Sequence, residues 1–178
     1  MEGVCFLTEG ESVADVADVG AADRWLIDSR QFAERGDVID AKLGEAALPR
    51  LGDEVVDSFD PVNVVVRGVR SPRGKLGLKV ALEGLVMLEC QRCLQPVSFA
   101  LASRASFELI DSQKALDVDD QDEWEPVMHS ERLDLLPLLE DELLLALPFA
   151  PMHDACVPVA PAEAGIRVSP FAALEQLK

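Results

Sequence analysis

The sequence has little positive charge. Its 178 residues include 16 lysines and arginines against 33 aspartates and glutamates, so the formal net charge is −17. An acidic surface repels phosphate backbones, and this excess disfavours indiscriminate binding to nucleic acid. The exception is the segment 64–104, where seven basic residues stand against two acidic ones. One mildly basic segment therefore lies within an otherwise acidic chain.

We expect no segment that exports the chain or anchors it to a membrane. The first residues, MEGVCFLTEG, have neither the basic start nor the apolar stretch of a secretory signal. The longest apolar run, LLLALPFAPM from Leu143, contains two prolines and is too short to span a bilayer. We expect a soluble cytoplasmic protein with no membrane partner. In that reducing compartment Cys5, Cys90, Cys93 and Cys156 are expected to be thiols or metal ligands rather than disulfides.

Alternation of apolar and polar residues predicts a sheet in the middle of the chain. The period of two begins at Val62 and resumes in KLGLKVALEGLVMLEC after a turn at 71–74. It returns after QRCLQP in a third segment that extends to Leu109. Three consecutive strands with short connections predict an antiparallel meander with one buried face. Helical patterns flank these strands, so the expected fold class is α+β.

A helix is predicted after the sheet. In DLLPLLEDELLLALP, Asp134 is a suitable N-cap, Pro137 falls in the first turn and Pro148 ends the helix. Its three successive acids, from Glu140 to Glu142, fan around the helix instead of converging. We therefore expect them to form a solvated face rather than a metal or acid–base site.

The chain is expected to have three parts. Residues 1–50 form a helical or irregular arm, and residues 51–150 form a core of antiparallel sheet and acidic helix. Residues 151–178 form a proline-rich tail that ends in a short helix at SPFAALEQLK. These boundaries follow from the interrupted helical pattern before residue 50 and from the prolines between 148 and 161.

Cys90 and Cys93 form a CxxC pair in the expected tight connection between the second and third strands. Such a turn lets two thiolates converge on one tetrahedral ion, as in a zinc knuckle. His153 and Cys156, just after the acidic helix, would complete a closed structural zinc site, and His129 is a weaker candidate. A redox pair is an alternative, although no helix N-terminus follows to lower a thiol pKa. Plain reduced thiols are a third possibility, and both alternatives stay open.

Three motifs occur in a characteristic order: LECQRCLQPV after an apolar strand, LLEDELLLALPFAPMHDAC, and the terminal SPFAALEQLK. Together they resemble the YceD-like family of large ribosomal RNA subunit accumulation proteins, over most of residues 40–178. The resemblance implies a bacterial cytoplasmic protein that is needed for normal amounts of large-subunit ribosomal RNA and has no known enzymatic reaction. Some relatives have a second CxxC where this chain has His153 and Cys156. By analogy, this supports a zinc site at Cys90, Cys93, His153 and Cys156.

A ribosome-biogenesis factor of this composition has two routes to act. In the first, the basic segment binds the ribosomal RNA of a large-subunit precursor. The residues expected to do so are Arg67, Arg70, Arg73, Lys75 and Arg92. Arg92, at the tip of the CxxC turn, is the one most expected to contact phosphate. In the second route, the acidic segment 111–131 binds a basic ribosomal protein or assembly factor, and the effect on RNA is indirect.

Enzymatic function is not expected. The sequence has no nucleophile–base pair, phosphate loop or convergent carboxylates, and we expect no small-molecule substrate. The favoured interpretation is a non-catalytic factor that supports the synthesis, processing or stability of large-subunit ribosomal RNA. The alternatives are an acidic chaperone for a ribosomal protein and a thiol oxidoreductase that uses Cys90 and Cys93.

Overall fold

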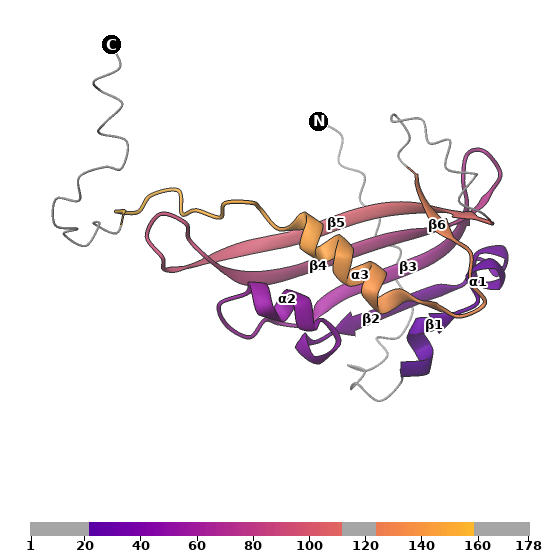
Figure 1. Ribbon diagram of the computed structural model, residues 1–178, viewed down its shortest axis with the longest axis horizontal. Coiled ribbons are helices and arrows are strands. Elements are labelled where there is room, and N and C mark those ends of the chain that lie inside the picture. Colours follow the sequence, from indigo (N-terminus) through magenta and orange to yellow (C-terminus); the bar gives the residue numbers. More distant parts are fainter. Residues whose placement is uncertain (1–21, 112–123, 159–178) are drawn as a thin grey trace, which may run out of the picture.

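A five-stranded β-sheet is the centre of the fold in a computed structural model that describes residues 22–111 and 124–158 (Figure 1). Its strands are β2 (Val38–Leu43), β3 (Val62–Arg70), β4 (Leu76–Glu89), β5 (Pro96–Ile110) and β6 (Glu125–Met128), which lie side by side in chain order. Neighbours from β2 to β5 run antiparallel, whereas β6 runs parallel to β5. The three strands predicted from the alternation correspond to β3, β4 and β5. The parallel β6 was not expected.

The remaining elements are short. Before β2 lie the 3-10 helix η1 (Ala22–Trp25), β1 (Leu26–Ile27) and α1 (Ser29–Arg35), and after β2 lie η2 (Glu45–Ala47) and α2 (Pro49–Glu54). After β6 come β7 (Leu133–Asp134), which pairs with β1, and α3 (Leu135–Ala146). The expected mixture of helices and antiparallel strands is confirmed. Within the described ranges, no helix is long and apolar enough to cross a membrane.

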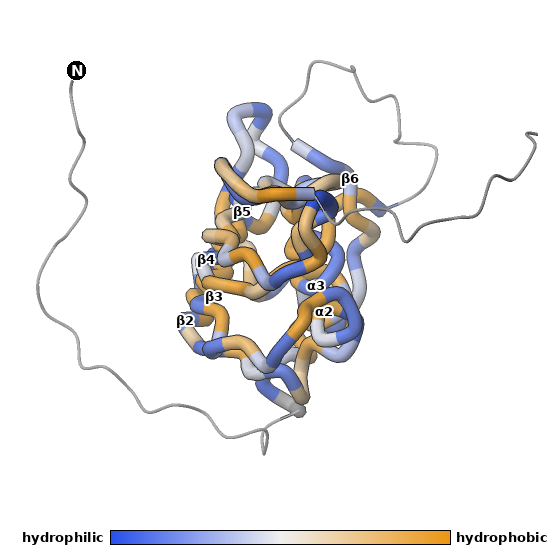
Figure 2. Tube along the Cα trace, turned by 90° about the vertical axis from the view of Figure 1, so that its left-hand side faces the viewer, coloured by the Kyte–Doolittle hydropathy of each residue, from blue (hydrophilic) through white to orange (hydrophobic). Residues whose placement is uncertain are grey.

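One face of the sheet is buried beneath helices. Figure 2 shows α2 and α3 on the same side of the strands. Alternate side chains of each long strand point toward these helices, as the period of two predicts. The fully buried residues on this side include Val62, Val64, Val66, Leu78 and Leu82 from the sheet and Leu135, Leu139 and Leu143 from α3.

Helix α3 begins where the sequence predicted. The carboxylate of Asp134 accepts a hydrogen bond from the backbone N–H of Leu136 at 3.1 Å, as an N-cap does. The expectation of a solvated acidic face is wrong for two of the three acids. Glu140 is 5% exposed and Glu142 is 9% exposed, and only Asp141 faces solvent.

Glu140 is buried because it caps another helix. Its carboxylate accepts hydrogen bonds from the backbone N–H groups of Arg50 at 2.7 Å and Leu51 at 3.2 Å, in the first turn of α2. The N-cap residue of α2, Leu48, has no side chain that could accept them. Glu140 on α3 therefore supplies the N-terminal cap that the sequence of α2 lacks, and it links the two helices.

Helix α1 lies directly against β3 at Gly68. A Cβ at this position would lie 2.3 Å from the backbone oxygen of Phe32 and 2.8 Å from the Cα of Ala33, both in α1. Backbone can approach backbone this closely only where there is no side chain. Gly68 therefore fixes how near α1 sits to the sheet.

Gly68→Ala is expected to push α1 from the sheet and to lower the free energy of unfolding by about 1–3 kcal/mol. The matched control is Gly44→Ala, because an added Cβ at Gly44 has no heavy atom within 4 Å. Urea denaturation of both variants measures the difference. Equal midpoints for the two variants would contradict the close packing of α1.

The predicted arm, residues 1–50, contains β2, which forms the edge of the sheet beside β3. The sequence did not predict that strand. The division of the chain into arm, core and tail stays a prediction. The expected helix in SPFAALEQLK and residues 112–123 of the acidic segment lie outside the described residues.

Candidate metal centre

The CxxC pair lies in the connection between β4 and β5, as predicted. The N–H of Cys90 donates to the carbonyl oxygen of Gln95 at 3.0 Å, and the N–H of Leu94 donates to the carbonyl oxygen of Cys90 at 2.8 Å. Leu94 has a left-handed backbone conformation with φ of 57°, which leucine rarely adopts. These contacts make a tight loop with Cys90 and Cys93 on the same side.

The segment that follows α3 folds back over this turn. The N–H of Gln91 donates to the carbonyl oxygen of Pro151 at 2.9 Å. Arg92 donates from Nη2 to the carbonyl oxygen of His153 at 2.7 Å and from Nε to Cys156 Sγ at 2.9 Å. The arginine between the two cysteines of the CxxC pair therefore holds the later segment against the turn.

The four side chains predicted as ligands converge, and we call them the cysteine cluster: Cys90, Cys93, His153 and Cys156. One ligand atom from each lies within 4.8 Å of all the others. The two sulfurs of Cys90 and Cys156 are 3.8 Å apart, and Cys93 Sγ lies 3.4 Å from His153 Nδ1. A tetrahedral zinc ion with Zn–S bonds of about 2.3 Å and Zn–N bonds of about 2.0 Å separates such atoms by about 3.8 Å and about 3.5 Å. The donor set and its spacing fit a metal ion.

The protonation states in the cysteine cluster suit ligation. His153 Nε2 lies 3.1 Å from the carbonyl oxygen of Pro96, which can only accept, so Nε2 carries the proton and Nδ1 is left to bind a metal. Burial opposes ionisation of Cys90, but hydrogen bonds from the backbone of Cys93, His153 and Arg92 outweigh it and lower the pKa of Cys90 to about 5. Metals bind the thiolate form.

Cys93 has the opposite tendency. A hydrogen bond from the backbone of Gln95 favours its thiolate, but burial and the sulfurs of Cys90 and Cys156 outweigh that bond and raise the pKa of Cys93. Several thiolates cannot share this small volume without a cation between them. The cation already in place is Arg92, whose pKa is raised by its hydrogen bond to Cys156 and by that thiolate's charge.

The basic residues predicted to bind RNA or a partner do not form one surface. Arg67, Arg70, Arg73 and Lys75 lie on β3 or in the turn that follows it. Arg92 lies beyond the other end of β4. At the usual rise per strand residue, the 14 residues of β4 place it about 40 Å from the turn between β3 and β4. Arg92 is partly buried and its guanidinium donates within the cysteine cluster. The phosphate contact expected of Arg92 therefore has no support from its position.

The turn between β3 and β4 is held by Glu108 of β5. Glu108 is 4% exposed, and its carboxylate accepts hydrogen bonds from Ser71 Oγ at 3.1 Å, Arg73 Nε at 3.2 Å and Nη2 at 3.1 Å, and Lys75 Nζ at 2.7 Å. Burial opposes its ionisation, but the bonds from Lys75, Ser71 and Arg73 outweigh burial and lower the pKa of Glu108. Two of the predicted binding residues are thus partly engaged with a buried acid.

Glu108→Gln is expected to lower the free energy of unfolding by about 1–2 kcal/mol at neutral pH, because three donors lose a charged acceptor. The pKa of Glu108 is lowered by folding, so this stabilisation is present above the unfolded pKa of about 4.3 and is lost as pH falls through the folded pKa. Thermal unfolding of wild type and variant across this range measures the effect. A difference in midpoint that does not shrink below about pH 4.3 would contradict it.

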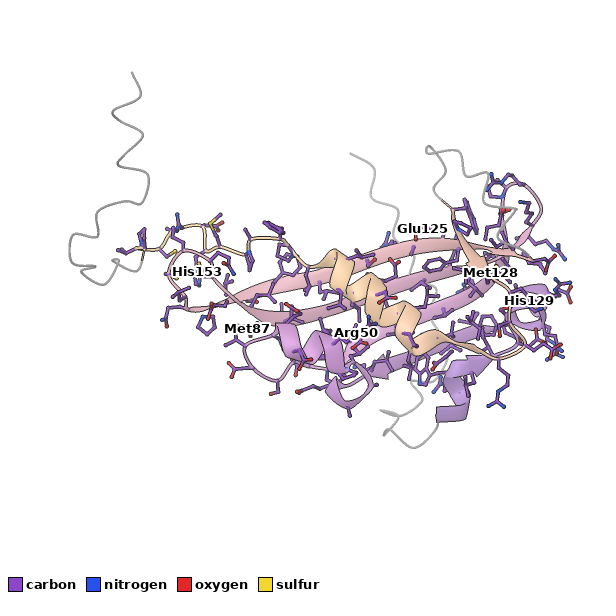
Figure 3. All side chains as sticks on the ribbon, viewed as in Figure 1. Arg50, Met87, Glu125, Met128, His129 and His153 are labelled. Atoms are coloured by element: carbon purple, nitrogen blue, oxygen red, sulfur yellow. The ribbon has the colours of Figure 1, made fainter. Side chains whose placement is uncertain are left out.

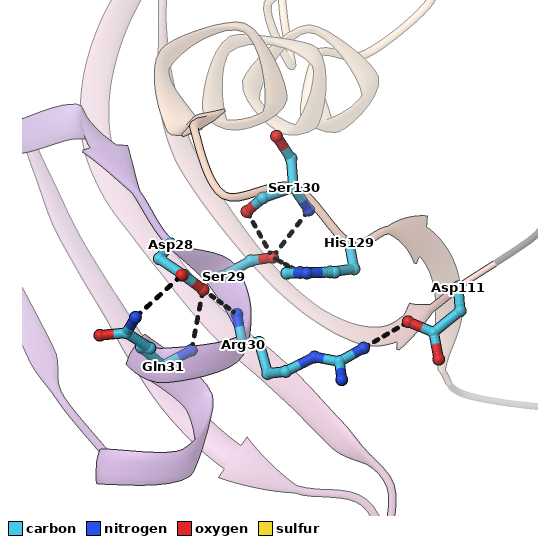
Figure 4. Close-up of polar contacts among 7 residues, drawn as sticks. All are labelled: Asp28, Ser29, Arg30, Gln31, Asp111, His129 and Ser130. Atoms are coloured by element: carbon cyan, nitrogen blue, oxygen red, sulfur yellow. Dashed lines mark hydrogen bonds and ion pairs between the residues drawn. The ribbon is translucent and has the colours of Figure 1, made fainter.

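His129, the weaker ligand candidate, lies away from the cysteine cluster. Figure 3 places His129 and His153 at opposite ends of the sheet. His129 Nδ1 lies 2.9 Å from Ser29 Oγ, and that hydroxyl also accepts from the backbone N–H of Ser130 at 3.1 Å (Figure 4). This contact joins α1 to the loop before β7, which no local sequence pattern indicated.

Fold and site together define an α+β protein with a cluster of three cysteines and one histidine at one end of a long sheet. This cluster could hold a metal ion. The family model described as large ribosomal RNA subunit accumulation protein YceD matches residues 78–178, which include α3 and the whole cysteine cluster. A Haemophilus influenzae protein named large ribosomal RNA subunit accumulation protein YceD is 31% identical over an alignment of 143 residues, and the match covers 74% of this chain and 82% of the relative.

The chain therefore belongs to the YceD family. This confirms the resemblance found in the three motifs. The first two of these motifs contain the four residues of the cysteine cluster. No solved structure matches the chain.

Proposed function

We propose that this protein is a non-catalytic factor that supports the accumulation of large-subunit ribosomal RNA by binding a precursor particle, directly or through a basic assembly partner. The observation that carries the proposal is family membership, which rests on a family match over residues 78–178 and on a relative that covers 74% of the chain. The family is named for accumulation of this RNA, which is an effect on amount rather than a chemical reaction.

The proposal includes a structural zinc ion in the cysteine cluster. Three thiolates and one imidazole are the ligand set that structural zinc prefers, and such sites have no open position for a substrate. The sulfur–sulfur spacing of 3.8 Å and the sulfur–nitrogen spacing of 3.4 Å support this assignment. The hydrogen bond from His153 Nε2 to Pro96 supports it too, because metal-binding histidines are commonly oriented by such a contact.

A catalytic role has less support. Cys90 has a lowered pKa, as a redox thiol would, but its side chain is completely buried and no partner disulfide could reach it. Glu140, the acid most enclosed on α3, is occupied by the backbone of α2. Cys93 Sγ lies 3.4 Å from His153 Nδ1, as a nucleophile lies beside a base, but the proposal assigns both atoms to the metal ion.

The test is a strain that lacks the gene, complemented with wild type or with variants, in which the ratio of large- to small-subunit ribosomal RNA is measured. The proposal predicts that loss of the gene lowers the ratio and that wild type restores it. The Cys90→Ser, Cys93→Ser double variant should fail to restore it, and Cys5→Ser, which changes the cysteine that is not a predicted ligand, should succeed. A ratio unchanged by loss of the gene would sink the proposal.

The route to the RNA is tested by capture of the tagged protein from growing cells, with and without ribonuclease. A ribosomal protein or assembly factor that stays bound after ribonuclease indicates an indirect route. Recovery of precursor particles only when RNA is intact indicates a direct one. A protein that captures neither would contradict action by binding.

A further inference from the structure

A basic hollow lies at the end of the sheet opposite the cysteine cluster. Its volume is about 280 Å³, and its lining includes Arg30 from α1, Arg70 from the end of β3, Lys75 from the following turn and Asp111 after β5. The apolar parts of the lining come from Leu76 and Leu109. Three cations from three separate segments thus converge beside one carboxylate, in a chain whose net charge is −17.

The cations of the hollow keep donors for a ligand. Arg70 makes one long hydrogen bond, from Nη1 to the carbonyl oxygen of Gly74 at 3.4 Å, and its other N–H groups have no acceptor among the described residues. Lys75 donates one hydrogen bond from Nζ to Glu108, and 53% of its side chain is exposed to solvent. Arg30 pairs through Nη2 with Asp111, and both of these side chains are open to solvent.

Rigid contacts hold these groups in place. Asp28 accepts hydrogen bonds from the N–H groups of Arg30 at 3.1 Å and Gln31 at 3.0 Å and so fixes the start of α1 (Figure 4). The hydroxyl of Ser29 fastens the same turn to Ser130. On the other side, Glu108 anchors the turn that carries Lys75. The backbone that carries Arg30 and Lys75 is therefore held in place, which lowers the cost of binding an ion there.

We infer that this hollow binds a phosphate group of an RNA backbone. The inference rests on the proposed function and names the surface through which it would act. Guanidinium groups match phosphate oxygens with paired N–H donors, and a nearby lysine adds a point charge. The volume lies at the lower limit of ligand pockets, which suits one phosphate group with part of a nucleotide better than a larger organic ligand. The net charge of −17 disfavours contact of the RNA backbone with the rest of the chain.

The charge of Asp111 is expected to oppose RNA binding in the hollow. Its carboxylate lies at the edge of the hollow and occupies one donor of Arg30. A bound phosphate must compete with that carboxylate for Arg30 and meets its negative charge. Removing the charge at position 111 should therefore tighten binding, whereas removing a cation should weaken it. A purely structural role for these residues predicts no such gain.

The experiment measures fluorescence anisotropy of a labelled single-stranded RNA of about 12 nucleotides, a length typical of single-strand binding sites. Arg70→Gln and Arg30→Gln should each raise Kd about fivefold and reduce the slope of log K against log salt by about 0.7. Asp111→Asn should lower Kd about threefold. The matched control Arg104→Gln removes one exposed cation of β5 outside the hollow and should leave Kd within about twofold.

Several results would overturn the inference. Equal Kd values for wild type, Arg70→Gln and Asp111→Asn, with unchanged thermal midpoints, would show that the hollow does not contact RNA. Inorganic phosphate that binds while the RNA does not would overturn the assignment to an RNA backbone. A poly-glutamate peptide that binds more tightly than the RNA, with the same dependence on Arg70, would assign the hollow to an acidic protein instead.

The inference and the proposed function fail in different ways. If Arg70→Gln loses RNA affinity but restores ribosomal RNA in the strain that lacks the gene, the hollow is not the working surface and the proposed function stands. If loss of the gene leaves ribosomal RNA unchanged, the proposed function fails whatever the affinity of the hollow. Weaker RNA binding together with failed restoration supports both.

Discussion

Protein purified without chelator is expected to carry about one zinc ion per chain, and Cys156→Ser is expected to lose it almost completely. Cys156 is the proposed ligand from the segment after α3 and accepts a hydrogen bond from Arg92, so its loss should also release that segment from the CxxC turn. The sheet core does not depend on the cluster for its packing, since β3, β4 and α3 bury their leucines and valines elsewhere. We therefore expect local release of residues 151–158 with a smaller change in global stability.

Elemental analysis gives the zinc content, and hydrogen exchange reports the local release. Faster exchange should appear at the N–H of Gln91, whose acceptor Pro151 moves away, and not in β4. The control is Cys5→Ser, which should keep its zinc. Less than about a tenth of an ion per wild-type chain, or a full ion in Cys156→Ser, would contradict a four-ligand site.

Glu140→Gln is expected to lower the free energy of unfolding by about 2–4 kcal/mol. Glu140 accepts three hydrogen bonds: from the N–H groups of Arg50 and Leu51 and, at 2.7 Å, from Arg50 Nε. A glutamine in this place can accept through one oxygen only, and its amide nitrogen would face another donor. Both backbone N–H groups bond to the same oxygen, Oε1, so a glutamine that still caps α2 turns its amide nitrogen toward Arg50 Nε and loses that charged contact. The opposite orientation keeps the contact with Arg50 Nε but presents a donor, instead of an acceptor, to the first turn of α2 and the fully buried Leu51.

The matched control is Asp141→Asn, one residue along α3. Asp141 also pairs with Arg50, through Nη1 at 2.6 Å, but its side chain is 56% exposed. Exposed ion pairs contribute little, so this variant should lose less than about 1 kcal/mol. Guanidinium denaturation of both variants separates the two roles. Equal losses would mean that α2 is not capped by Glu140.

Local patterns predicted the centre of the sheet but not its edges. Strands β3 to β5 alternate clearly over nine to fifteen residues, long enough for a period of two to be recognised. Strand β2 has the sequence VIDAKL, whose alanine, lysine and leucine also favour helix. Strand β6 has four residues and contains Pro126, so it gives no readable period.

The four residues of the cysteine cluster could be predicted to lie together, but the contacts that assemble the cluster could not. A CxxC pair in a tight turn is a local signal, and His153 and Cys156 are near neighbours in the chain. The bond from Arg92 to Cys156 joins residues 64 positions apart. The same holds for Glu140 and Arg50, 90 positions apart. A helical projection of α3 shows the direction in which each acid points. It does not show that the uncapped first turn of α2 lies next to Glu140.

The most direct test of a zinc ion in the cysteine cluster is zinc K-edge X-ray absorption of protein purified without chelator. A four-ligand zinc site in the cysteine cluster predicts a first shell of three sulfurs at about 2.3 Å and one nitrogen at about 2.0 Å. Those atoms are the sulfurs of Cys90, Cys93 and Cys156 and Nδ1 of His153. A shell of oxygen and nitrogen alone, or the absence of zinc together with three freely titratable thiols at these positions, would contradict it.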